Sequence, residues 1–403
     1  MARVIVVGGG IGGLAAALAI TRQGHRVVVL EREAAFAELG AGMQLAPNGI
    51  HALDRLGLGD RVRESAVHID ELRFMDGVTG RHVVSMPLTG AYRRRFGNPY
   101  VVAHRGDLYR LLLRACRARA DIELRPGCRA TGYRQDGRSA TAVLDTGERV
   151  TGDALIGADG VHSAIRRQLV GDGPPRVAGI TVFRSVIPMA RVPERLRWNR
   201  VTWWAGPGRH FVHYPIGGGA YLNLAPSIEN GVTEEFADVP VSAEQVLDAF
   251  TPLGAAARRL LALGADWRSW VLIDRDPVPG WTDGRVTLLG DAAHPMLHYA
   301  AQGACQSLED AVFLGDLLAC PPAEFGLRFR LYNVGRRERT ARMQHIARES
   351  TKLWHPAGAA AVARNAMLSA FSATELHDRV AWMHGARDFG PAVEGTAPQG
   401  VAG

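Results

Sequence analysis

The chain has 403 residues, of which 47% are hydrophobic and 22% charged, and its formal net charge is +7 at pH 7. This composition is typical of a globular protein, and the length predicts two closely packed lobes. No apolar run reaches the roughly 18 residues of a membrane span, the basic residues form no stripe with aromatics, and neither a secretory leader nor metal-spaced cysteines and histidines are evident. We therefore expect a cytoplasmic protein with no membrane span, no metal site and no nucleic-acid partner.

The N-terminal stretch predicts a dinucleotide-binding unit of strand, helix and strand. Residues 2–7 are a largely β-branched run, residues 14–23 fit a helix, and residues 26–30 fit a second strand. The glycines between the first strand and the helix follow the pattern GxGxxG, and an acidic residue stands about 20 residues further on. The predicted cofactor-binding residues here are Gly8, Gly10, Gly12, Gly13, Glu31 and Arg32. This motif allows close approach to a pyrophosphate, but it does not by itself choose between FAD and NAD.

Three later stretches have glycine or polar residues beside predicted strands and helices. Residues 37–58 begin as a loop of small residues with Gln44 and then fit a helix from about residue 48. Arg105 stands just before a predicted helix that runs to about residue 117. Residues 154–166 fit a strand, a turn at Asp159 and Gly160, and a helix.

The densest group of polar residues lies between residues 285 and 315. A short apolar strand ends at Gly290 and Asp291, a loop with Pro295, two histidines and Tyr299 follows, and an apolar-periodic helix begins after Gly303. The helix would present free N–H groups and the positive end of its dipole to an anion. Asp291 could accept hydrogen bonds from a polyol, so this stretch predicts a second part of the same ligand site.

Residues 176–274 predict an antiparallel sheet, because alternating segments rich in Trp and Val are separated by Gly and Pro. In one of these segments His210, Val212 and Tyr214 share a face, while Phe211 and His213 point the other way. A histidine and a tyrosine on one face could line an aromatic pocket, and ordinary core packing is the alternative. The chain is then predicted to be helical to about residue 347 and again beyond it, with residues 390–403 disordered.

Taken together, these motifs resemble the single-component FAD-dependent aromatic hydroxylases, the class A flavoprotein monooxygenases. The resemblance covers roughly residues 2–345 and is closest to 3-hydroxybenzoate 6-hydroxylases, then to 6-hydroxynicotinate 3-monooxygenases and salicylate hydroxylases. It implies an α/β (α+β) fold with a Rossmann-like FAD-binding domain in two parts, residues 1–175 and 276–345. An antiparallel-sheet substrate domain, residues 176–275, would be inserted between them, and residues 346–403 would form a C-terminal helical segment and tail.

The resemblance also implies roles for individual residues. FAD would be held non-covalently, with further contacts from Arg105, Asp159, Gly160, Asp291, Gly303 and Ala304. Catalytic roles would fall to Tyr214, His210, His298 and Gln44. The substrate would be contacted by Tyr299, Pro295, His213 and Trp204. NADH or NADPH and O2 would be co-substrates, and the family leads us to expect a homodimer.

The implied reaction is hydroxylation of a phenolic aromatic acid through a flavin C4a-hydroperoxide, with 3-hydroxybenzoate converted to gentisate or a close analogue. A phenol with a pKa near 10 must lose its proton first, and Tyr214, aided by His210, is the predicted acceptor or relay. Arg184 is one of several candidates to bind the carboxylate. The 3-hydroxybenzoate enzymes usually have glutamine at the position of His298 and a large residue at that of Ala300. A tailoring hydroxylase, epoxidase or oxidase acting on another aromatic natural-product intermediate is therefore the alternative.

Overall fold

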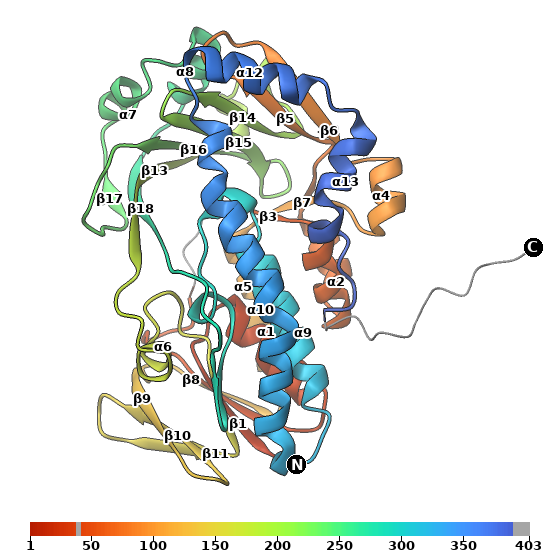
Figure 1. Ribbon diagram of the computed structural model, residues 1–403, viewed down its shortest axis with the longest axis vertical. Coiled ribbons are helices and arrows are strands. Elements are labelled where there is room, and N and C mark those ends of the chain that lie inside the picture. Colours follow the sequence, from red (N-terminus) through yellow and green to blue (C-terminus); the bar gives the residue numbers. More distant parts are fainter. Residues whose placement is uncertain (38–41, 390–403) are drawn as a thin grey trace, which may run out of the picture.

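The computed structural model describes residues 1–37 and 42–389. The lower lobe in Figure 1 contains a six-stranded sheet in the order β19-β20-β12-β1-β2-β8, in which only the edge pair β19 and β20 is antiparallel. Its strands are β1 (Arg3–Val7), β2 (Arg26–Leu30), β8 (Ile122–Arg125), β12 (Ala154–Gly157), β19 (Thr282–Asp283) and β20 (Val286–Leu288). Both β1 and β2 are buried after their first residue, as expected for parallel strands covered on both faces.

Helices cover this sheet, and one of them connects the two lobes. They are α1 (Ile11–Thr21), α5 (Arg105–Arg117), α6 (Ala164–Leu169), α9 (Gly303–Leu317) and α10 (Phe325–Glu349). Helices α1 and α9 approach closely at Gly315, where a Cβ atom would lie 2.6 Å from the Cβ of Ala19. Helix α10 runs from the lower lobe to the upper one (Figure 1). A small antiparallel sheet flanks the lower lobe and contains β9 (Ala130–Gln135), β10 (Ala140–Leu144) and β11 (Arg149–Gly152).

The upper lobe is built on an eight-stranded sheet in the order β17-β18-β13-β16-β15-β14-β5-β6. Its strands are β5 (Glu71–Asp76), β6 (His82–Pro87), β13 (Arg176–Pro188), β14 (Arg200–Gly206), β15 (Arg209–Ile216), β16 (Tyr221–Glu229), β17 (Val239–Pro240) and β18 (Arg268–Asp274). All neighbours are antiparallel except β14 and β5. The predicted antiparallel sheet is therefore present. The predicted boundary is wrong in one respect, because β5 and β6 come from the segment assigned to the first part of the FAD-binding domain.

The two faces of the large sheet have different neighbours. One face packs on two short helices that the sequence analysis did not predict, α7 (Ala243–Ala249) and α8 (Ala255–Leu261). Phe183, Trp204, Phe211 and Leu224 lie in this core with Val246 and Leu260 of the helices. Side chains alternate along each strand, so the residues between them face the opposite side, toward the lower lobe.

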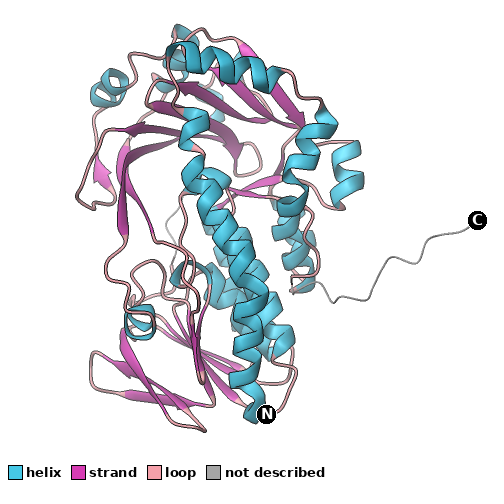
Figure 2. Cartoon of the chain, in the orientation of Figure 1, coloured by secondary structure: helices cyan, strands magenta, loops and turns pink. Residues whose placement is uncertain are grey.

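The remaining elements close the space between the lobes and cover the edge of the large sheet (Figures 1 and 2). They are β3 (Gly42–Leu45), β4 (Val67–His68), β7 (Val101–His104), α2 (Pro47–Arg55), α3 (Gly59–Ser65), α4 (Ala91–Phe96), α11 (Thr351–Trp354), α12 (Gly358–Ser369) and α13 (Ala373–His384), with short 3-10 turns at Met189–Arg191, Glu194–Leu196, Gly290–Ala292, His298–Ala300 and Pro322–Glu324. Trp354 anchors the C-terminal segment, because its ring stacks on Phe74 at 5.1 Å and on Trp203 at 5.5 Å.

The architecture confirms the predicted α/β (α+β) fold class, with a mostly parallel sheet in one lobe and a mostly antiparallel sheet in the other. None of the helices in the described ranges is long and apolar enough to span a membrane. The predicted disordered tail, residues 390–403, lies outside the described residues, as do residues 38–41 of the small-residue loop.

Candidate active site

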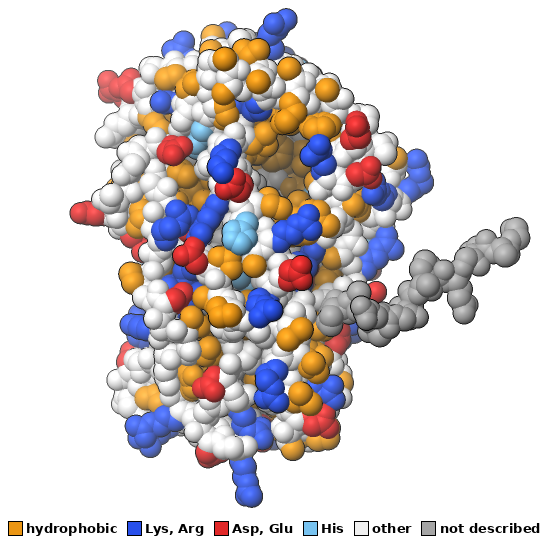
Figure 3. Space-filling model, in the orientation of Figure 1, with side chains coloured by type: hydrophobic (Ala, Val, Ile, Leu, Met, Phe, Trp, Pro, Cys, Tyr) orange, Lys and Arg blue, Asp and Glu red, His pale blue; other side chains and the backbone are white. Residues whose placement is uncertain are grey.

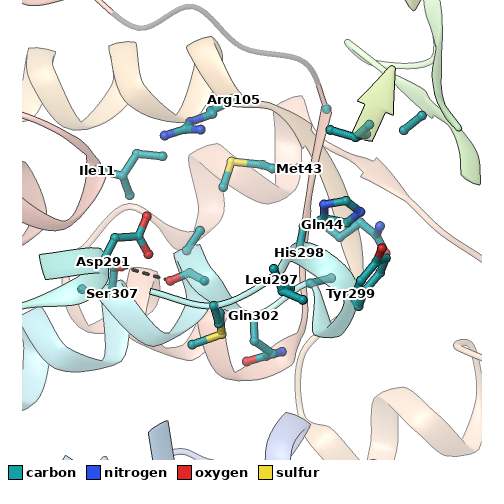
Figure 4. A pocket seen from close by; sticks show the side chains of 18 of the residues that line it. Ile11, Met43, Gln44, Arg105, Asp291, Leu297, His298, Tyr299, Gln302 and Ser307 are labelled. Atoms are coloured by element: carbon teal, nitrogen blue, oxygen red, sulfur yellow. Dashed lines mark hydrogen bonds between the residues drawn. The ribbon is translucent and has the colours of Figure 1, made fainter. Parts of the chain in front are cut away.

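A cavity of about 380 Å³ lies where the two lobes meet. It is lined by the turn before α1, the start of α9 and the loop that precedes it, β3, and one face of the large sheet. Figure 4 shows Ile11, Arg105 and Asp291 toward one end of this cavity and Gln44, His298 and Tyr299 toward the other. The two ends are lined by different kinds of residue. The N-terminal glycine motif lies at the end with Ile11, Arg105 and Asp291.

The glycines of the N-terminal motif have two separate functions in the structure. Gly8 has a φ of +109°, and a Cβ there would lie 2.3 Å from the carbonyl oxygen of Ala158. At Gly13 a Cβ would lie 1.9 Å from the carbonyl oxygen of Gly8. These two glycines therefore allow close packing of backbone on backbone and do not line the cavity, whereas Gly10 and Gly12 do.

The first end of the cavity fits a ligand that carries phosphates. A Cβ built on Gly10 would meet no atom within 4 Å, so open space lies in front of this residue. Helices α1 and α9 both begin at the cavity, and neither has a side-chain cap on its N-terminal N–H groups. Such uncapped ends bind anions, and the two together suit a pyrophosphate-containing cofactor such as FAD.

Glu31 and the predicted arginines have different positions relative to this end. The Glu31 carboxylate accepts hydrogen bonds from the backbone N–H of Gly9 at 2.8 Å and of Glu33 at 2.9 Å, which fixes it beside the glycine turn. Arg105 lines the cavity from the first turn of α5. Arg32 does not line it, because its side chain is exposed and pairs with Glu33 at 3.1 Å. The structure therefore gives no support to a cofactor contact from Arg32.

Asp159 and Gly160 have different roles in the structure. Asp159 accepts hydrogen bonds from the Ser163 hydroxyl at 2.5 Å and from the Ala164 N–H at 2.8 Å, so its carboxylate holds the start of α6. Burial raises the pKa of Asp159 above its usual range. Gly160, with a φ of +79°, lines the cavity through its backbone. Asp159 therefore positions this turn, and Gly160 is the member of the pair that faces the ligand space.

The loop after β20 brings Asp291 to the cavity, and hydrogen bonds from Arg166 hold this loop in place. The exposed Asp291 carboxylate lines the cavity together with Gly303 and Ala304 at the start of α9. Buried Arg166 donates to the carbonyl oxygens of Ala292 at 3.0 Å and of Ala293 at 2.6 Å. The predicted acceptor for a polyol is thus held rigidly at the cofactor end.

Replacing Gly10 with valine is expected to weaken FAD binding by roughly 10- to 100-fold without unfolding the protein. The φ of −74° at Gly10 is allowed for any residue, and the new side chain would occupy only ligand space. FAD fluorescence titration and the melting temperature of the apoprotein measure the two effects. Gly137 is the matched control, because a Cβ there also meets no atom within 4 Å but the residue does not line the cavity. Equal FAD affinity for G10V and G137V would contradict this assignment.

The second end of the cavity is formed by one face of the large sheet. The lining residues alternate along four neighbouring strands: Val182, Arg184, Trp203, His210, Val212, Tyr214, Asn223 and Ala225. Trp203 lies directly opposite Val212 in the register of β14 and β15, so the two share this face. The sequence analysis placed His210 and Tyr214 on one face of their strand, and both line the cavity here.

Three predicted substrate contacts are placed elsewhere by the structure. Trp204 is buried in the core under α7 and α8, and His213 packs against it with ring centroids 6.4 Å apart. His213 is out of phase with His210 on β15, and Trp204 of β14 lies opposite Phe211 in the core, so both side chains face away from the cavity. Pro295 is buried outside the lining, where its carbonyl accepts a hydrogen bond from Gln344 at 3.2 Å. The expected cavity positions of Trp204, His213 and Pro295 are therefore wrong, and Trp203 takes the position expected for Trp204.

Tyr214 is held beside Gln44 at the wall of the cavity. Its hydroxyl donates to the carbonyl oxygen of Gly42 at 3.0 Å. The Gln44 amide oxygen accepts a hydrogen bond from the hydroxyl of Tyr100 at 2.6 Å. Burial raises the pKa of Tyr214 to about 12, although Arg184 and Gln44 act in the opposite direction. Tyr214 is therefore a neutral hydrogen-bond donor near pH 7.

Several buried polar atoms beside this end of the cavity have no hydrogen-bond partner. Among the described residues they include the Nε2 of His210, the Nδ1 of His298, the hydroxyl of Tyr299 and the side-chain nitrogen of Gln302. The rings of His210 and Tyr299 have centroids 5.1 Å apart. Burial and Arg184 lower the pKa of His298 to about 3, so this imidazole is neutral. Buried polar atoms are normally satisfied, so this group indicates a polar ligand.

Arg184 is the cationic group at this end of the cavity. Its guanidinium lies 5.2 Å from the centre of the Trp270 ring, and burial lowers its pKa. Within residues 1–37 and 42–389 no carboxylate forms an ion pair with it. The sequence analysis named Arg184 only as one of several candidates. Its place on the same face as Val182, two residues before it on β13, was the signal that could have identified it.

Known proteins support the assignment of the cofactor end. The FAD binding domain family matches residues 1–350. The chain is 44% identical over 383 residues to 3-hydroxybenzoate 6-hydroxylase 1 of Aquipseudomonas alcaligenes, which covers 95% of this chain and 97% of that protein. It is 34% identical over 399 residues to 3-amino-4-hydroxybenzoate 2-monooxygenase of Streptomyces cremeus, covering 98% of each.

A solved structure is also similar to this chain over nearly its whole length. A salicylate hydroxylase substrate complex superimposes with a TM-score of 0.82 at 25% identity and covers 96% of this chain and 95% of that one. The predicted resemblance is thus confirmed in sequence and in fold. Because these relatives match nearly the whole chain and are hydroxylases or monooxygenases of aromatic acids, the chain belongs to the FAD-dependent aromatic hydroxylases, monooxygenases that use NAD(P)H and O2.

Proposed function

We propose that this protein hydroxylates 3-hydroxybenzoate at carbon 6 and releases gentisate, the 2,5-dihydroxy acid. The relatives that are 41% to 44% identical over 95% of the chain are 3-hydroxybenzoate 6-hydroxylases. Carbon 6 is para to the ring hydroxyl, where an ionised hydroxyl raises the electron density of the ring. The arrangement of charge and hydrogen-bonding atoms in the cavity supports the same substrate.

The observation that carries this proposal is the half-buried guanidinium of Arg184 at the cavity wall. Partial removal from water lowers the pKa of Arg184, and among the described residues no carboxylate forms an ion pair with it. An aromatic carboxylate bound in the cavity would supply this charge and could form two parallel hydrogen bonds with the guanidinium. The proposed substrate therefore has its carboxylate at Arg184 and its ring hydroxyl toward the polar atoms of the other wall.

His210 and Tyr214 support ionisation of the ring hydroxyl from that wall. Burial, with contributions from His355 and His298, lowers the pKa of His210 well below its usual value, so its imidazole is neutral, and its Nε2 has no partner among the described residues and can accept a hydrogen bond from the ring hydroxyl. Tyr214 remains protonated, and its one hydroxyl hydrogen can turn from the Gly42 carbonyl to the phenolate that forms. We therefore assign the acceptor role to His210 and the stabilising role to Tyr214. Bound FAD supplies the oxygen chemistry, and Gly10, Gly12, Arg105, Gly160, Asp291, Gly303 and Ala304 are the residues that would hold it.

The two departures from the 3-hydroxybenzoate enzymes differ in their consequences for this pocket. His298 lines the cavity, where its neutral ring can hydrogen-bond to substrate much as an amide would. Ala300 does not line it, so the smaller side chain adds no space to the substrate end. This placement favours a simple benzoate over the larger natural-product intermediate of the alternative.

The test is NADH and NADPH oxidation by the FAD-loaded protein with a panel of aromatic acids. The panel contains 3-hydroxybenzoate, 4-hydroxybenzoate, salicylate, anthranilate, 6-hydroxynicotinate and 3-amino-4-hydroxybenzoate, and both hydroxylated product and peroxide are quantified. We expect 3-hydroxybenzoate to give gentisate with little peroxide. Peroxide without product from every simple benzoate would overturn the proposed substrate and favour a different aromatic compound.

A homodimer remains a prediction for this chain. Leu327, Leu331 and Val334 on α10 are exposed by 48%, 41% and 62%, and their spacing places them on one face of the helix. Hydrophobic side chains also line a depression in the upper half of the face shown in Figure 3. Exposed apolar surface of this kind supports contact with a second copy. The predicted cytoplasmic location likewise remains a prediction.

A further inference from the structure

Three side chains form a hydrogen-bonded row from the cavity wall to the protein surface. The Nδ1 of His210 lies 3.0 Å from the Nε2 of His355, and the Nδ1 of His355 lies 2.9 Å from a carboxylate oxygen of Glu229. The two imidazole centroids are 5.3 Å apart, which fits rings that meet edge to edge through this contact. His210 lines the cavity, His355 is 6% exposed and Glu229 is 55% exposed. The row therefore joins the substrate end of the cavity to solvent.

The carboxylate at the outer end fixes the direction of every hydrogen bond in the row. An ionised carboxylate can only accept, so the Nδ1 of His355 must carry a hydrogen. Burial lowers the pKa of His355 and His210, so both rings are neutral and each has one N–H. The Nε2 of His355 is then an acceptor, and the Nδ1 of His210 must donate to it. This leaves the Nε2 of His210 as a bare acceptor, and that atom has no partner within the described part of the chain.

The fold holds this row in place from both sides. The carbonyl oxygen of His355 accepts a hydrogen bond from the N–H of Gly208 at 3.0 Å, and the N–H of Glu229 donates to the carbonyl oxygen of Gly208 at 2.8 Å. The turn before β15 therefore fixes both outer members, while His210 lies on β15 itself. Trp354, next to His355, packs on His210 with centroids 5.8 Å apart. The C-terminal segment is thus anchored where it can complete the row.

We propose that His355 and Glu229 relay to solvent the proton that the substrate hydroxyl gives to His210, an inference that rests on the proposed function. The O–H bond of the substrate breaks as an N–H bond forms at the Nε2 of His210. The hydrogen on the Nδ1 of His210 passes to the Nε2 of His355, and that on the Nδ1 of His355 passes to Glu229 and then to water. The net result is one phenolate in the cavity, one proton in solvent and both imidazoles with hydrogen on Nε2; rotation of the rings or return of a proton restores the starting tautomers. No electron is transferred.

The tyrosine side of the cavity offers no comparable exit. Tyr214 is near Gln44, and Gln44 is bonded to Tyr100, whose side chain is only 3% exposed. Burial raises the pKa of Tyr100 well above its usual value, so it does not release a proton near pH 7. The charged or titratable groups that face the outer members of the row are Arg209, beside His355, and Tyr299, beside Glu229. Glu229 is therefore the member of the row that can exchange a proton with water.

The first test determines the imidazole tautomers by nitrogen-15 NMR of histidine-labelled, FAD-loaded enzyme without substrate, with H210N and H355N used for assignment. We expect both His210 and His355 to carry hydrogen on Nδ1 near pH 7.5. In E229Q the tautomer of His355 should no longer be fixed, because an amide can either donate or accept. Hydrogen on the Nε2 of His210 in the wild-type protein would overturn the relay. This readout does not depend on which substrate is turned over.

The second test measures proton release when 3-hydroxybenzoate binds to the enzyme in weak buffer containing an indicator dye. E229Q and H355N should release the proton about tenfold more slowly than wild type, with an unchanged dissociation constant, and E229D should restore the rate. E235Q is the matched control, because Glu235 accepts from His162 at 2.8 Å in an exposed pair outside the cavity lining. Wild-type rates in both E229Q and H355N would overturn the relay. If 3-hydroxybenzoate does not bind but His210 and His355 both carry hydrogen on Nδ1, the proposed substrate is wrong. The hydrogen-bonded row of His210, His355 and Glu229 is then still supported.

Discussion

Replacing Arg184 with methionine is expected to raise the dissociation constant of 3-hydroxybenzoate by about 100-fold or more. The substrate carboxylate would lose its charged partner at the cavity wall. The folded protein should be about as stable as wild type, because the substitution removes a half-buried charge that forms no ion pair with a described carboxylate. Titration of the flavin absorbance with substrate and urea denaturation measure the two effects.

Two controls separate a lost charge from a damaged sheet. Arg268 lies opposite Arg184 in the neighbouring strand β18, but it pairs with Asp238 at the surface, so R268M should bind substrate like wild type. In R184M, 3-hydroxybenzyl alcohol should lose far less affinity than 3-hydroxybenzoate, because it has no carboxylate. Equal losses for the acid and the alcohol would show that Arg184 shapes the pocket and does not bind the carboxylate.

The cofactor end of the site could be predicted from sequence because its signals are local. Strand β2 begins and ends at the predicted residues, and α9 begins at Gly303 as expected. Gly13 is required by its contact with Gly8 within the strand-turn-helix unit, which the spacing of the motif encodes directly, whereas Gly8 meets Ala158, just after the distant strand β12. Asp291 follows a short apolar strand and precedes a helix start, so its position at the cavity also follows from neighbouring residues.

The substrate end could be predicted only in part because it depends on which face of the sheet is covered. The sequence separates His210 from His213 by their alternation, yet it does not say which of the two faces lies under helices. Helices α7 and α8 decide this, and they are too short to leave a strong periodic signal. Trp204 and His213 were placed on the wrong side for this reason.

Contacts between distant segments could not be predicted. His355 is 145 residues from His210 and 126 residues from Glu229, and nothing in the local sequence around it marks a functional residue. The same holds for the buried charges behind the cavity, where residues of α9 meet residues of α10. These contacts are set by how the long helix α10 crosses α9 between the two lobes.

A buried ionic network supports the loop that carries Asp291. Asp310 accepts from the N–H of Gly290 at 3.0 Å and from His294 at 2.6 Å, which fixes both sides of the loop. Arg336 of α10 pairs with Asp310 and with Glu309, each at 2.6 Å, and all three of these side chains are fully buried. The loop geometry at the cofactor end therefore depends on one arginine in the C-terminal half.

Replacing Arg336 with methionine is expected to lower the free energy of unfolding by about 3 to 5 kcal/mol at pH 7. Two buried carboxylates would lose a cation, and methionine fills similar space without supplying hydrogen bonds. FAD affinity should fall as well, because the loop with Asp291 loses part of its support. Urea denaturation of the apoprotein and FAD titration measure these changes. R328M is the matched control on the same helix, because Arg328 pairs with Glu324 at the surface and its loss should have little effect.

The difference in the free energy of unfolding between wild type and R336M depends on pH through the pKa values of Glu309 and Asp310. Burial alone would raise the pKa of Asp310, but the charges of His294 and Arg336 outweigh burial and lower this pKa. The pKa of Glu309 is lowered in the same way by Arg336 and Arg339. A lowered pKa contributes stability that is complete above the pKa of the unfolded carboxyl, about 4, and is lost as the pH falls further. The difference between wild type and R336M should therefore be full at pH 7 and shrink below roughly pH 4. A difference that stays constant down to pH 3 would mean that Arg336 stabilises α10 by packing and not by its charge.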